Sequence, residues 1–320
     1  MADTKIFDVL IVGGGFAGLS AAGTLARQLH TVVVFDSGSY RNARSKHLHM
    51  MPTWDHQDPE SFRAATRADL KRYDTVELCE TEIGTLAKGS DALFEAKDSN
   101  GRQWRGRKVI LANGVQEQFP ALSGYDECWA RAIYHCLFCH GYEQRGAESA
   151  GVLAIDWIAS ARMAMHVAHM ASSLVRMVTI YTNGNEALAE DLVQALSGAS
   201  QYHVDPRAIT KITYHEDSKE LVQIQFEDGS DPKGEAFLAH SPRTRVNGPF
   251  AEQLGLELTA TGDYVVQPPF NATSVDGVFA AGDCTSMFKV GTKAVADGSM
   301  AGAGVSARLQ EERLAMNPVF

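Results

Sequence analysis

The stretch VLIVGGGFAG at residues 9–18 decides the fold of this chain, because an apolar run leads directly into a glycine-rich turn. Residues 6–12 form the apolar run, and the turn has the spacing Gly13-x-Gly15-x-x-Gly18. Residues 19–29 then have helical spacing, and a second apolar run over residues 31–35 ends at Asp36. This order of strand, turn, helix, strand and acid predicts a βαβ unit that binds a dinucleotide.

The residue types in this unit match the chemistry of a dinucleotide. Glycines let the backbone turn tightly and bring amide groups against a pyrophosphate at the helix N-terminus. Asp36 is placed to accept hydrogen bonds from a ribose. A glycine-rich turn without consequence is the alternative, and it would not require Asp36.

Two later segments are typical of the same kind of fold. Residues 108–114 read as a strand that ends in a turn of small residues, and residues 277–283 read as another strand that ends at Gly282-Asp283. We expect a helix over about residues 292–309 after the second strand. Gly282-Asp283 taken alone would also fit an ordinary β-turn.

The tetrapeptide Cys136-Leu-Phe-Cys139 indicates redox chemistry on sulfur. Two residues between the sulfurs allow a reducible disulfide, and we expect the pair at the start of a helix, where backbone amides favour a thiolate. Half of a zinc site is the alternative, but structural zinc needs two more ligands at matching spacing. The remaining cysteines are isolated in the sequence: Cys79, Cys128 and Cys284.

Composition limits the possible classes of protein. The chain has 320 residues, of which 45% are hydrophobic, enough for two domains with complete cores. A net charge of -10 argues against a nucleic-acid partner. The first residues lack the regions of a signal peptide and no long apolar stretch follows, so we expect an intracellular, cytoplasmic protein without a membrane partner. Five scattered cysteines do not form a structural disulfide framework.

A second βαβ unit begins at Gly151, but its turn is degenerate. The strand of residues 151–155 is followed by Asp156-Trp-Ile-Ala-Ser-Ala161, where a nucleotide site needs Gly-x-Gly-x-x-Ala. Asp156 would place a negative charge beside a pyrophosphate, and Ile158 would place a branched side chain where the backbone must approach. The exit of the next strand, residues 182–186, has no Arg or Lys for a 2′-phosphate. We therefore expect a Rossmann shell that has lost NADPH binding.

Histidines suggest no metal site in the sequence. His166 and His169 are three residues apart on an expected helix, but no third ligand is apparent. His47 and His49 follow Arg41 in the irregular loop after Asp36. A loop at this position passes over a bound cofactor, so Arg41 and His49 are candidate contacts; a solvated basic loop is the alternative.

The whole chain resembles low-molecular-weight thioredoxin reductases, of the class II pyridine nucleotide-disulfide oxidoreductases. Within them it is most similar to fungal gliotoxin-type dithiol oxidases. The resemblance rests on four motifs: VVVFDSGSYRNA at residues 32–43, CWARAIYHCLFCHGYE at 128–143, IYTNGNEALA at 180–189 and VNGPFAEQL at 246–254.

This resemblance implies an α/β fold of two Rossmann-like, three-layer ββα domains, the second inserted in the first. An FAD-binding domain would comprise residues 1–117 and 245–320, and residues 118–244 would form the domain with the Cys pair and the degenerate NADPH site. FAD is the implied cofactor. The residues expected to bind it are Gly13, Gly14, Gly15, Phe16, Ala17, Asp36, Arg41, His49, Ala112, Gly114, Gly282, Asp283, Val290 and Gly291.

The resemblance also implies an activity. A small dithiol, chiefly a reduced epipolythiodioxopiperazine, would reduce the protein disulfide, and O₂ would finally accept the electrons to give H₂O₂; the usual assembly is a homodimer. Cys136 would face the substrate and Cys139 the flavin. His140 stands where the reductase pattern has an Asp that acts as acid or base, and His135 precedes the first Cys. We expect His140 or His135 to be the base.

Two other functions remain open at this point. An NADPH-dependent thioredoxin reductase would require the second domain to bind NADPH despite Asp156 and Ile158. A non-catalytic flavoprotein that binds metabolites would not require the two cysteines of the pair.

Overall fold

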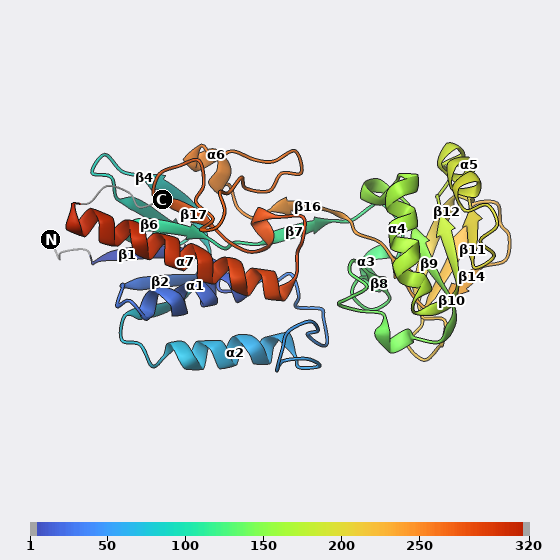
Figure 1. Cartoon of the computed structure of the whole chain (residues 1–320), viewed down its shortest axis with the longest axis horizontal. Coiled ribbons are helices and arrows are strands. Elements are labelled where there is room, and N and C mark those ends of the chain that lie inside the picture. The colour runs from blue at the N-terminus through green and yellow to red at the C-terminus, as the bar shows by residue number, and fades with distance from the viewer. Residues whose placement is uncertain (1–4, 316–320) are drawn as a thin grey trace. The chain divides into compact units, whose positions relative to one another are not determined.

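The computed structural model describes residues 5–315, which divide into two compact units (Figure 1). One unit runs up to Gln116 and resumes at Thr244, and the other comprises Glu117–Arg243. Strands β7 (Val115–Gln118) and β16 (Arg243–Val246), where the chain passes between the units, form a two-stranded sheet. The two units are described separately below.

The first unit contains a seven-stranded sheet in the order β3-β2-β1-β6-β5-β4, with β17 also paired to β6. Strands β3, β2, β1, β6 and β17 are parallel, and β4, β5 and β6 pair antiparallel. Its strands are β1 (Ile6–Val12), β2 (Val32–Asp36), β3 (Val76–Glu80), β4 (Ile83–Lys88), β5 (Phe94–Asp98), β6 (Gln103–Leu111) and β17 (Val278–Ala280). Its helices are α1 (Phe16–Ala26), α2 (Pro59–Leu70), α6 (Phe250–Leu254), the short 3₁₀ turn η3 (Asp283–Thr285) and α7 (Gly291–Leu314).

Strand β1 is apolar because both faces of the sheet are covered. Val9 and Ile11 pack in the cluster that includes residues of α1 and α7, whereas Leu10 and Val12 pack in the cluster on the other face. Successive side chains of a strand point to opposite faces, so a central strand with two covered faces needs an apolar residue at nearly every position.

Helices α1 and α7 lie side by side (Figure 1). Their approach depends on a missing side chain, because a Cβ atom at Gly298 would lie 2.1 Å from the carbonyl oxygen of Ala17. The sequence placed the end of the first helix at Leu29, but α1 ends at Ala26 and Leu29 has a φ of +60°, which ends a helix. Helix α7 also extends beyond the expected residues 292–309.

The second unit has a parallel five-stranded sheet in the order β11-β10-β9-β15-β8 and an antiparallel sheet in the order β12-β13-β14. Its strands are β8 (Ile133–Tyr134), β9 (Ala147–Leu153), β10 (Val175–Tyr181), β11 (Tyr202–Asp205), β12 (Ile209–Tyr214), β13 (Val222–Phe226), β14 (Lys233–Glu235) and β15 (Leu238–Ala239). Its helices are α3 (Tyr125–Cys128), α4 (Ala161–Ser172) and α5 (Glu186–Ala195), with 3₁₀ turns η1 (Tyr142–Gln144) and η2 (Asp156–Ile158).

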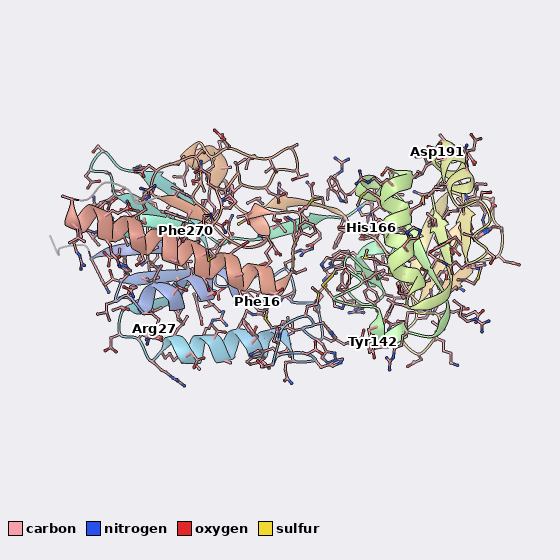
Figure 2. The ribbon with its side chains drawn as sticks, in the orientation of Figure 1. Phe16, Arg27, Tyr142, His166, Asp191 and Phe270 are labelled. Carbon is pink, nitrogen blue, oxygen red and sulfur yellow. A yellow bond between two sulfur atoms is a disulfide. The ribbon has the colours of Figure 1, made fainter. Side chains whose placement is uncertain are left out.

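Helix α4 covers this parallel sheet through its alanines, Ala164, Ala168 and Ala171, which are fully buried in a cluster with residues of β9 and β10. His166 lies on the exposed side of the same helix (Figure 2). Strand β9 starts at Ala147, four residues before the expected Gly151, and ends at Leu153.

The predicted fold class is confirmed: the chain is an α/β protein with two Rossmann-like units, and the second unit is inserted in the first. No helix among residues 5–315 is both long and apolar enough to cross a membrane.

Candidate functional site

The glycine-rich turn between β1 and α1 is packed so closely that side chains are excluded from most of it. Gly13 has a φ of +115°, and a Cβ atom there would lie 2.1 Å from the carbonyl oxygen of Ala112. A Cβ atom at Gly18 would lie 1.9 Å from the carbonyl oxygen of Gly13. A Cβ atom at Gly15, in contrast, would meet nothing within 4 Å, and no side chain caps the helix that begins there. The turn therefore leaves space and backbone amides for an anionic group.

Asp36 ends β2 and borders a cavity of about 680 Å³, which is large enough for a nucleoside. The carboxylate accepts hydrogen bonds from the Tyr40 hydroxyl at 2.7 Å, from the guanidinium of Arg67, and from the Gly38 amide at 3.0 Å. Burial and Asp36 raise the pKa of Tyr40 above its ordinary value. Arg67 comes from α2, and no local pattern in the sequence indicated that it meets Asp36.

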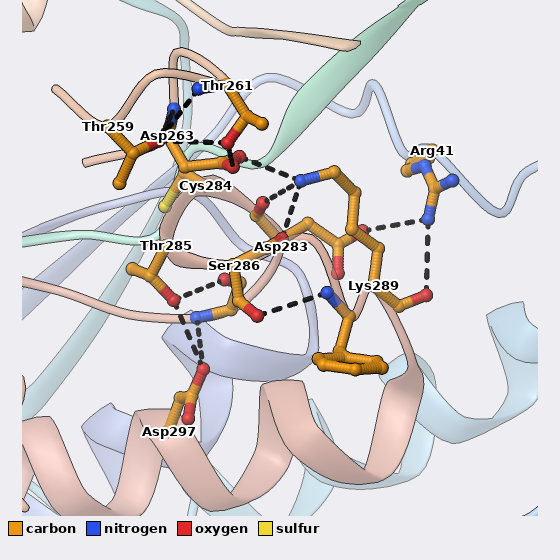
Figure 3. Close-up of polar contacts among 12 residues, drawn as sticks. Arg41, Thr259, Thr261, Asp263, Asp283, Cys284, Thr285, Ser286, Lys289 and Asp297 are labelled. Carbon is orange, nitrogen blue, oxygen red and sulfur yellow. Dashed lines mark hydrogen bonds and ion pairs between the residues drawn. The ribbon is translucent and has the colours of Figure 1, made fainter. Parts of the chain in front are cut away.

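The turn after β17 is held by a carboxylate of α7 (Figure 3). Gly282 donates its amide hydrogen to Asp297 Oδ2 at 3.2 Å, and Thr285 Oγ1 donates to the Gly282 carbonyl at 2.8 Å. Gly282 has a φ of +84°, and a Cβ atom there would lie 2.9 Å from the Cβ atom of Ala17. The turn thus lies against the start of α1.

A buried ion pair fixes the chain between this turn and α7 (Figure 3). Lys289 Nζ donates to Asp263 Oδ1 at 2.8 Å, to the Asp283 carbonyl at 2.8 Å and to the Ser286 carbonyl at 2.7 Å. The side chains of Lys289 and Asp263 are 8% and 5% exposed, so the charge of each depends on the other. Sequence reasoning missed both residues, because 26 positions separate them.

The expected cofactor-binding residues come from separate chain segments, which lie close together in the first unit. Arg41 donates from Nη1 to Asp283 Oδ2 and to the Lys289 carbonyl, both at 3.3 Å (Figure 3). A Cβ atom at Gly291 would lie 3.2 Å from the ring of Phe16, and Val290 precedes Gly291 as the N-cap of α7. Ala112 and Gly114 follow β6, and the Ala112 carbonyl lies against Gly13.

Asn113, between Ala112 and Gly114, was not singled out in the sequence. Its amide nitrogen donates to the Asn247 carbonyl and to the Tyr264 hydroxyl, but its Oδ1 is buried and has no hydrogen-bond partner within residues 5–315. A buried acceptor without a partner costs stability unless a ligand or water donates to it. The donor set and the open space at Gly15 therefore fit a nucleotide cofactor in this unit.

In the second unit, Cys136 and Cys139 form a disulfide with a Cα–Cα distance of 5.3 Å. The expectation that the pair starts a helix is wrong. Residues 136–140 form a single turn, in which the amides of Cys139 and His140 both donate to the Cys136 carbonyl at 3.1 Å. The turn ends at Gly141, whose φ of +99° is incompatible with a continued helix.

Two imidazoles flank the cysteine pair in the chain, and each packs on a large aromatic ring. The ring of His140 stacks on that of Tyr134 with centroids 5.2 Å apart, and the ring of His135 lies 5.9 Å from that of Trp129. The imidazoles themselves are 6.3 Å apart. Both imidazoles and both cysteines are half-buried. His135 and His140, the two expected bases, thus each adjoin one cysteine of the pair in the chain, and each ring packs on an aromatic neighbour.

The degenerate turn of the second unit is filled by the protein's own atoms. Asp156 has a φ of +48° and starts η2, and Ile158 is 2% exposed in the core cluster under α4. Ser160 caps α4 by accepting a hydrogen bond from the Met163 amide. A pyrophosphate binds where the amides at a helix N-terminus are free and the turn before the helix has no bulky side chain. The Ser160 cap and the buried Ile158 remove both features.

His240 lies at the carboxyl end of β15, beside β9, where the strand order of the sheet reverses and α/β proteins usually bind nucleotides. Its Nδ1 is 2.6 Å from the Tyr125 hydroxyl, and both side chains are buried. Burial lowers the pKa of His240 to about 4. This buried, neutral pair therefore lies at the reversal of the strand order, and no pattern in the sequence had indicated it.

The three other cysteines are poor nucleophiles. Cys128 and Cys284 are buried, and burial raises their thiol pKa values to about 11 and about 12. Burial also raises the pKa of Cys79. Because the thiolate is the reactive form, these raised pKa values disfavour reaction at the three cysteines.

Comparison with known proteins identifies relatives over nearly the whole chain. Residues 7–298 match the family described as Pyridine nucleotide-disulphide oxidoreductase. The chain is 44% identical to "Thioredoxin reductase aclD" of Aspergillus oryzae, over 95% of this chain and 96% of that protein. It is also 44% identical to "Thioredoxin reductase sirT" of Leptosphaeria maculans, over 94% of each. The solved structure of an oxidoreductase from Agrobacterium tumefaciens has a TM-score of 0.85, 30% identity, and coverage of 97% of this chain and 99% of that chain.

The matched family consists of FAD-binding flavoproteins, so FAD is the cofactor, as the sequence predicted. The open side of Gly15 and the unpartnered Asn113 Oδ1 are structural features that suit such a group.

The space at Gly15 gives a direct test of the cofactor position. We expect Gly15→Ala to leave the stability of the apoprotein unchanged, since its Cβ atom meets no protein atom within 4 Å, but to weaken FAD binding. Overpacking costs about 1–3 kcal/mol, which corresponds to roughly a 5- to 150-fold loss of FAD affinity. Urea unfolding of the apoprotein and FAD titration measure the two effects.

Gly84→Ala is the matched control, because a Cβ atom there also meets nothing within 4 Å and Gly84 lies in β4. It should change neither quantity. Normal FAD affinity in Gly15→Ala would remove this turn from the cofactor site.

Proposed function

The chain belongs to the pyridine nucleotide-disulphide oxidoreductase family, and we propose that it is an FAD-dependent dithiol oxidase. Its substrate would be a small secondary metabolite with two thiols, of the epipolythiodioxopiperazine type, in which it closes an intramolecular disulfide. O₂ would be the electron acceptor and H₂O₂ the product. The observation that carries this proposal is a reducible cysteine pair in a unit whose nucleotide turn is filled.

The filled turn argues that electrons enter through sulfur and not through a nicotinamide. A bound NADPH would need to displace buried Ile158 and to place its phosphates beside Asp156. It would also meet the buried His240–Tyr125 pair at the reversal of the strand order. Each of these changes costs stability through lost packing or charge repulsion.

The cysteine turn supports the complementary half of the cycle. A substrate thiolate attacks Cys136 Sγ, the Cys136–Cys139 bond breaks, and Cys139 leaves as a thiolate. The second substrate thiolate then attacks the substrate sulfur bound to Cys136, which releases Cys136 and closes the substrate disulfide. The substrate loses two electrons and two protons, and the protein disulfide gains the two electrons.

The imidazoles beside the turn are suited to move these protons. A neutral imidazole accepts a thiol proton near neutral pH, and the resulting imidazolium favours the thiolate form of a leaving cysteine. His140 is stacked on Tyr134 and follows Cys139 directly, so its ring orientation is more constrained than that of a free surface side chain. We assign the base to His140 and a supporting role to His135.

FAD supplies, when bound, a two-electron acceptor that regenerates the protein disulfide and reacts with O₂. The residues proposed to hold it are those that meet around the glycine-rich turn, with Asp36 at the ribose and Arg41 beside Asp283.

We also propose that the protein is an intracellular homodimer, as in the oxidases that the chain resembles. Sedimentation should give twice the mass of one chain, and a monomer would contradict this proposal.

An NADPH-dependent thioredoxin reductase is the second candidate. It is favoured by the names of the relatives, three of which, at 43–44% identity, are called thioredoxin reductases. The two functions differ in the source of electrons, so one anaerobic experiment separates them.

The source of electrons is tested by mixing the holoprotein anaerobically with either a small dithiol or NADPH. We expect the dithiol to bleach the flavin absorbance, and air to restore it with one H₂O₂ formed per disulfide. NADPH at about micromolar concentration should leave the flavin oxidised, because its site is filled. Stoichiometric bleaching by NADPH would instead favour the reductase.

The controls for this experiment remove one sulfur at a time. Cys136→Ser and Cys139→Ser should each abolish bleaching by the dithiol, because a single thiol cannot form the intramolecular disulfide. Cys128→Ser should leave bleaching unchanged, since Cys128 is buried with a raised thiol pKa.

The order of the two cysteines gives a second prediction. If Cys136 is attacked by the substrate, Cys139→Ser should form a stable mixed disulfide with an added aromatic disulfide, because no second cysteine resolves it. Cys136→Ser should react with the same aromatic disulfide at least about 10-fold more slowly. Mass spectrometry of the intact protein measures both, and equal rates would contradict the order.

The role of His140 gives a third prediction. A general base contributes roughly 10²- to 10⁴-fold, so His140→Ala should slow flavin reduction by a dithiol by about that factor at neutral pH. The deficit should shrink as pH rises toward the ordinary thiol pKa of about 8.5, because solvent then supplies the thiolate. Stopped-flow absorbance across this pH range is the measurement.

His140→Asp is the conservative control and should retain substantial activity, since a carboxylate at this position also accepts a proton. His135→Ala should cost less than His140→Ala. A His140→Ala protein with unchanged, pH-independent reduction would assign His140 to packing alone.

A further inference from the structure

We propose that His47, His49 and His56 form a zinc-binding site in the loop between β2 and α2. One ring nitrogen of each imidazole lies within 4.8 Å of one ring nitrogen of each of the other two. Among residues 5–315, the three side chains therefore form a group that could hold a metal ion. The three rings also contact one another, with centroids 4.6 Å apart for His49 and His56 and 5.8 Å apart for His47 and His56.

The spacing is close to that of a bound zinc ion. Tetrahedral Zn–N bonds of about 2.0–2.1 Å place ligand nitrogens about 3.3 Å apart. The imidazoles must therefore approach by at most roughly 1.5 Å, which rotation about their side-chain bonds provides. His47 and His56 are exposed and His49 is half-buried, so the two outer rings are free to rotate without disturbing a core.

The backbone around the three histidines is held in place independently of any metal. The Leu48 amide donates to the Gln57 carbonyl at 2.7 Å, and the His56 amide donates to the Leu48 carbonyl at 2.9 Å. These bonds pair the segment of His47 and His49 with the segment of His56. Leu48 is buried with Phe16 in a small cluster, which anchors the paired segments on the first unit. The site is thus largely formed before an ion arrives, which lowers the cost of binding.

The ligand set selects the class of ion. Imidazole nitrogens suit zinc and other late divalent metals, whereas magnesium and calcium need oxygen ligands. Three protein ligands leave the fourth position of a tetrahedral ion for water, so the site is of the open type. The net charge of -10 also favours a cation over an anion.

His49 is also a proposed contact of the cofactor. An imidazole has two ring nitrogens, and a histidine that binds zinc through one of them normally makes a hydrogen bond through the other. Zinc at this loop is therefore compatible with a nearby flavin. The loop connects β2, which ends at Asp36, to α2, which supplies Arg67, so an ion here would stiffen a segment that contributes to the proposed flavin site.

The test measures zinc binding to the chelator-treated holoprotein with the Cys136–Cys139 disulfide intact. Reduced cysteines bind zinc strongly, so no reductant is added. Calorimetric titration with Zn²⁺ should give one site per chain. X-ray absorption should show nitrogen ligands at about 2.0–2.1 Å and no sulfur at about 2.3 Å.

Substitutions then assign the ligands. His47→Ala and His56→Ala remove exposed side chains and should preserve the fold and FAD content, but each should weaken Zn²⁺ binding by at least about 10- to 100-fold, the loss that even an outer-sphere change can cause. The matched control is the double variant His166→Ala/His169→Ala, which removes two exposed histidines on α4 and should leave binding unchanged.

Three results would overturn the proposal. They are an absence of saturable Zn²⁺ binding, unchanged affinity in both His47→Ala and His56→Ala, and sulfur atoms bound directly to the ion. None of these results depends on dithiol oxidation, so the metal site and the proposed activity are tested separately.

Discussion

The nucleotide-binding unit depends on the close approach of backbones that only glycine permits. Gly13 and Gly18 allow the turn after β1 to close against itself and against the chain after β6, because a Cβ atom at either position would lie about 2 Å from a carbonyl oxygen. Gly298 permits the same closeness between α1 and α7. Once these contacts form, the N-terminus of α1, the turn at Gly282 and the loop after Asp36 converge on one region.

The second unit repeats the parallel topology without this constraint. Asp156 takes a positive φ without the freedom of glycine, Ile158 is buried, and Ser160 caps the helix that would otherwise receive a phosphate. The space that glycines keep open in the first unit is therefore occupied by side chains in the second. A sheet can lose a ligand and keep its topology because its stability comes from buried apolar faces such as those of β9 and β10.

Local patterns in the sequence predicted the elements that depend on local rules. The strand before Gly13, the helix after it and the acid at Asp36 follow from hydrophobic periodicity and turn chemistry, and the structure has them with small shifts at the helix ends. The prediction of a helix starting at Cys136 was wrong, because Gly141 ends the segment after a single turn. That signal was present in the sequence, because glycine is frequent where a helix ends.

Contacts between distant segments could not be predicted, because no local pattern encodes them. Arg67 reaches Asp36 from α2, and His240 reaches Tyr125 across 115 positions. His56 joins His47 and His49 only because backbone hydrogen bonds pair the two parts of the loop. Each of these contacts places a polar or ionisable group beside a proposed ligand site. Local patterning thus builds the framework, whereas the groups beside the proposed ligand sites are brought together by contacts that only the folded structure reveals.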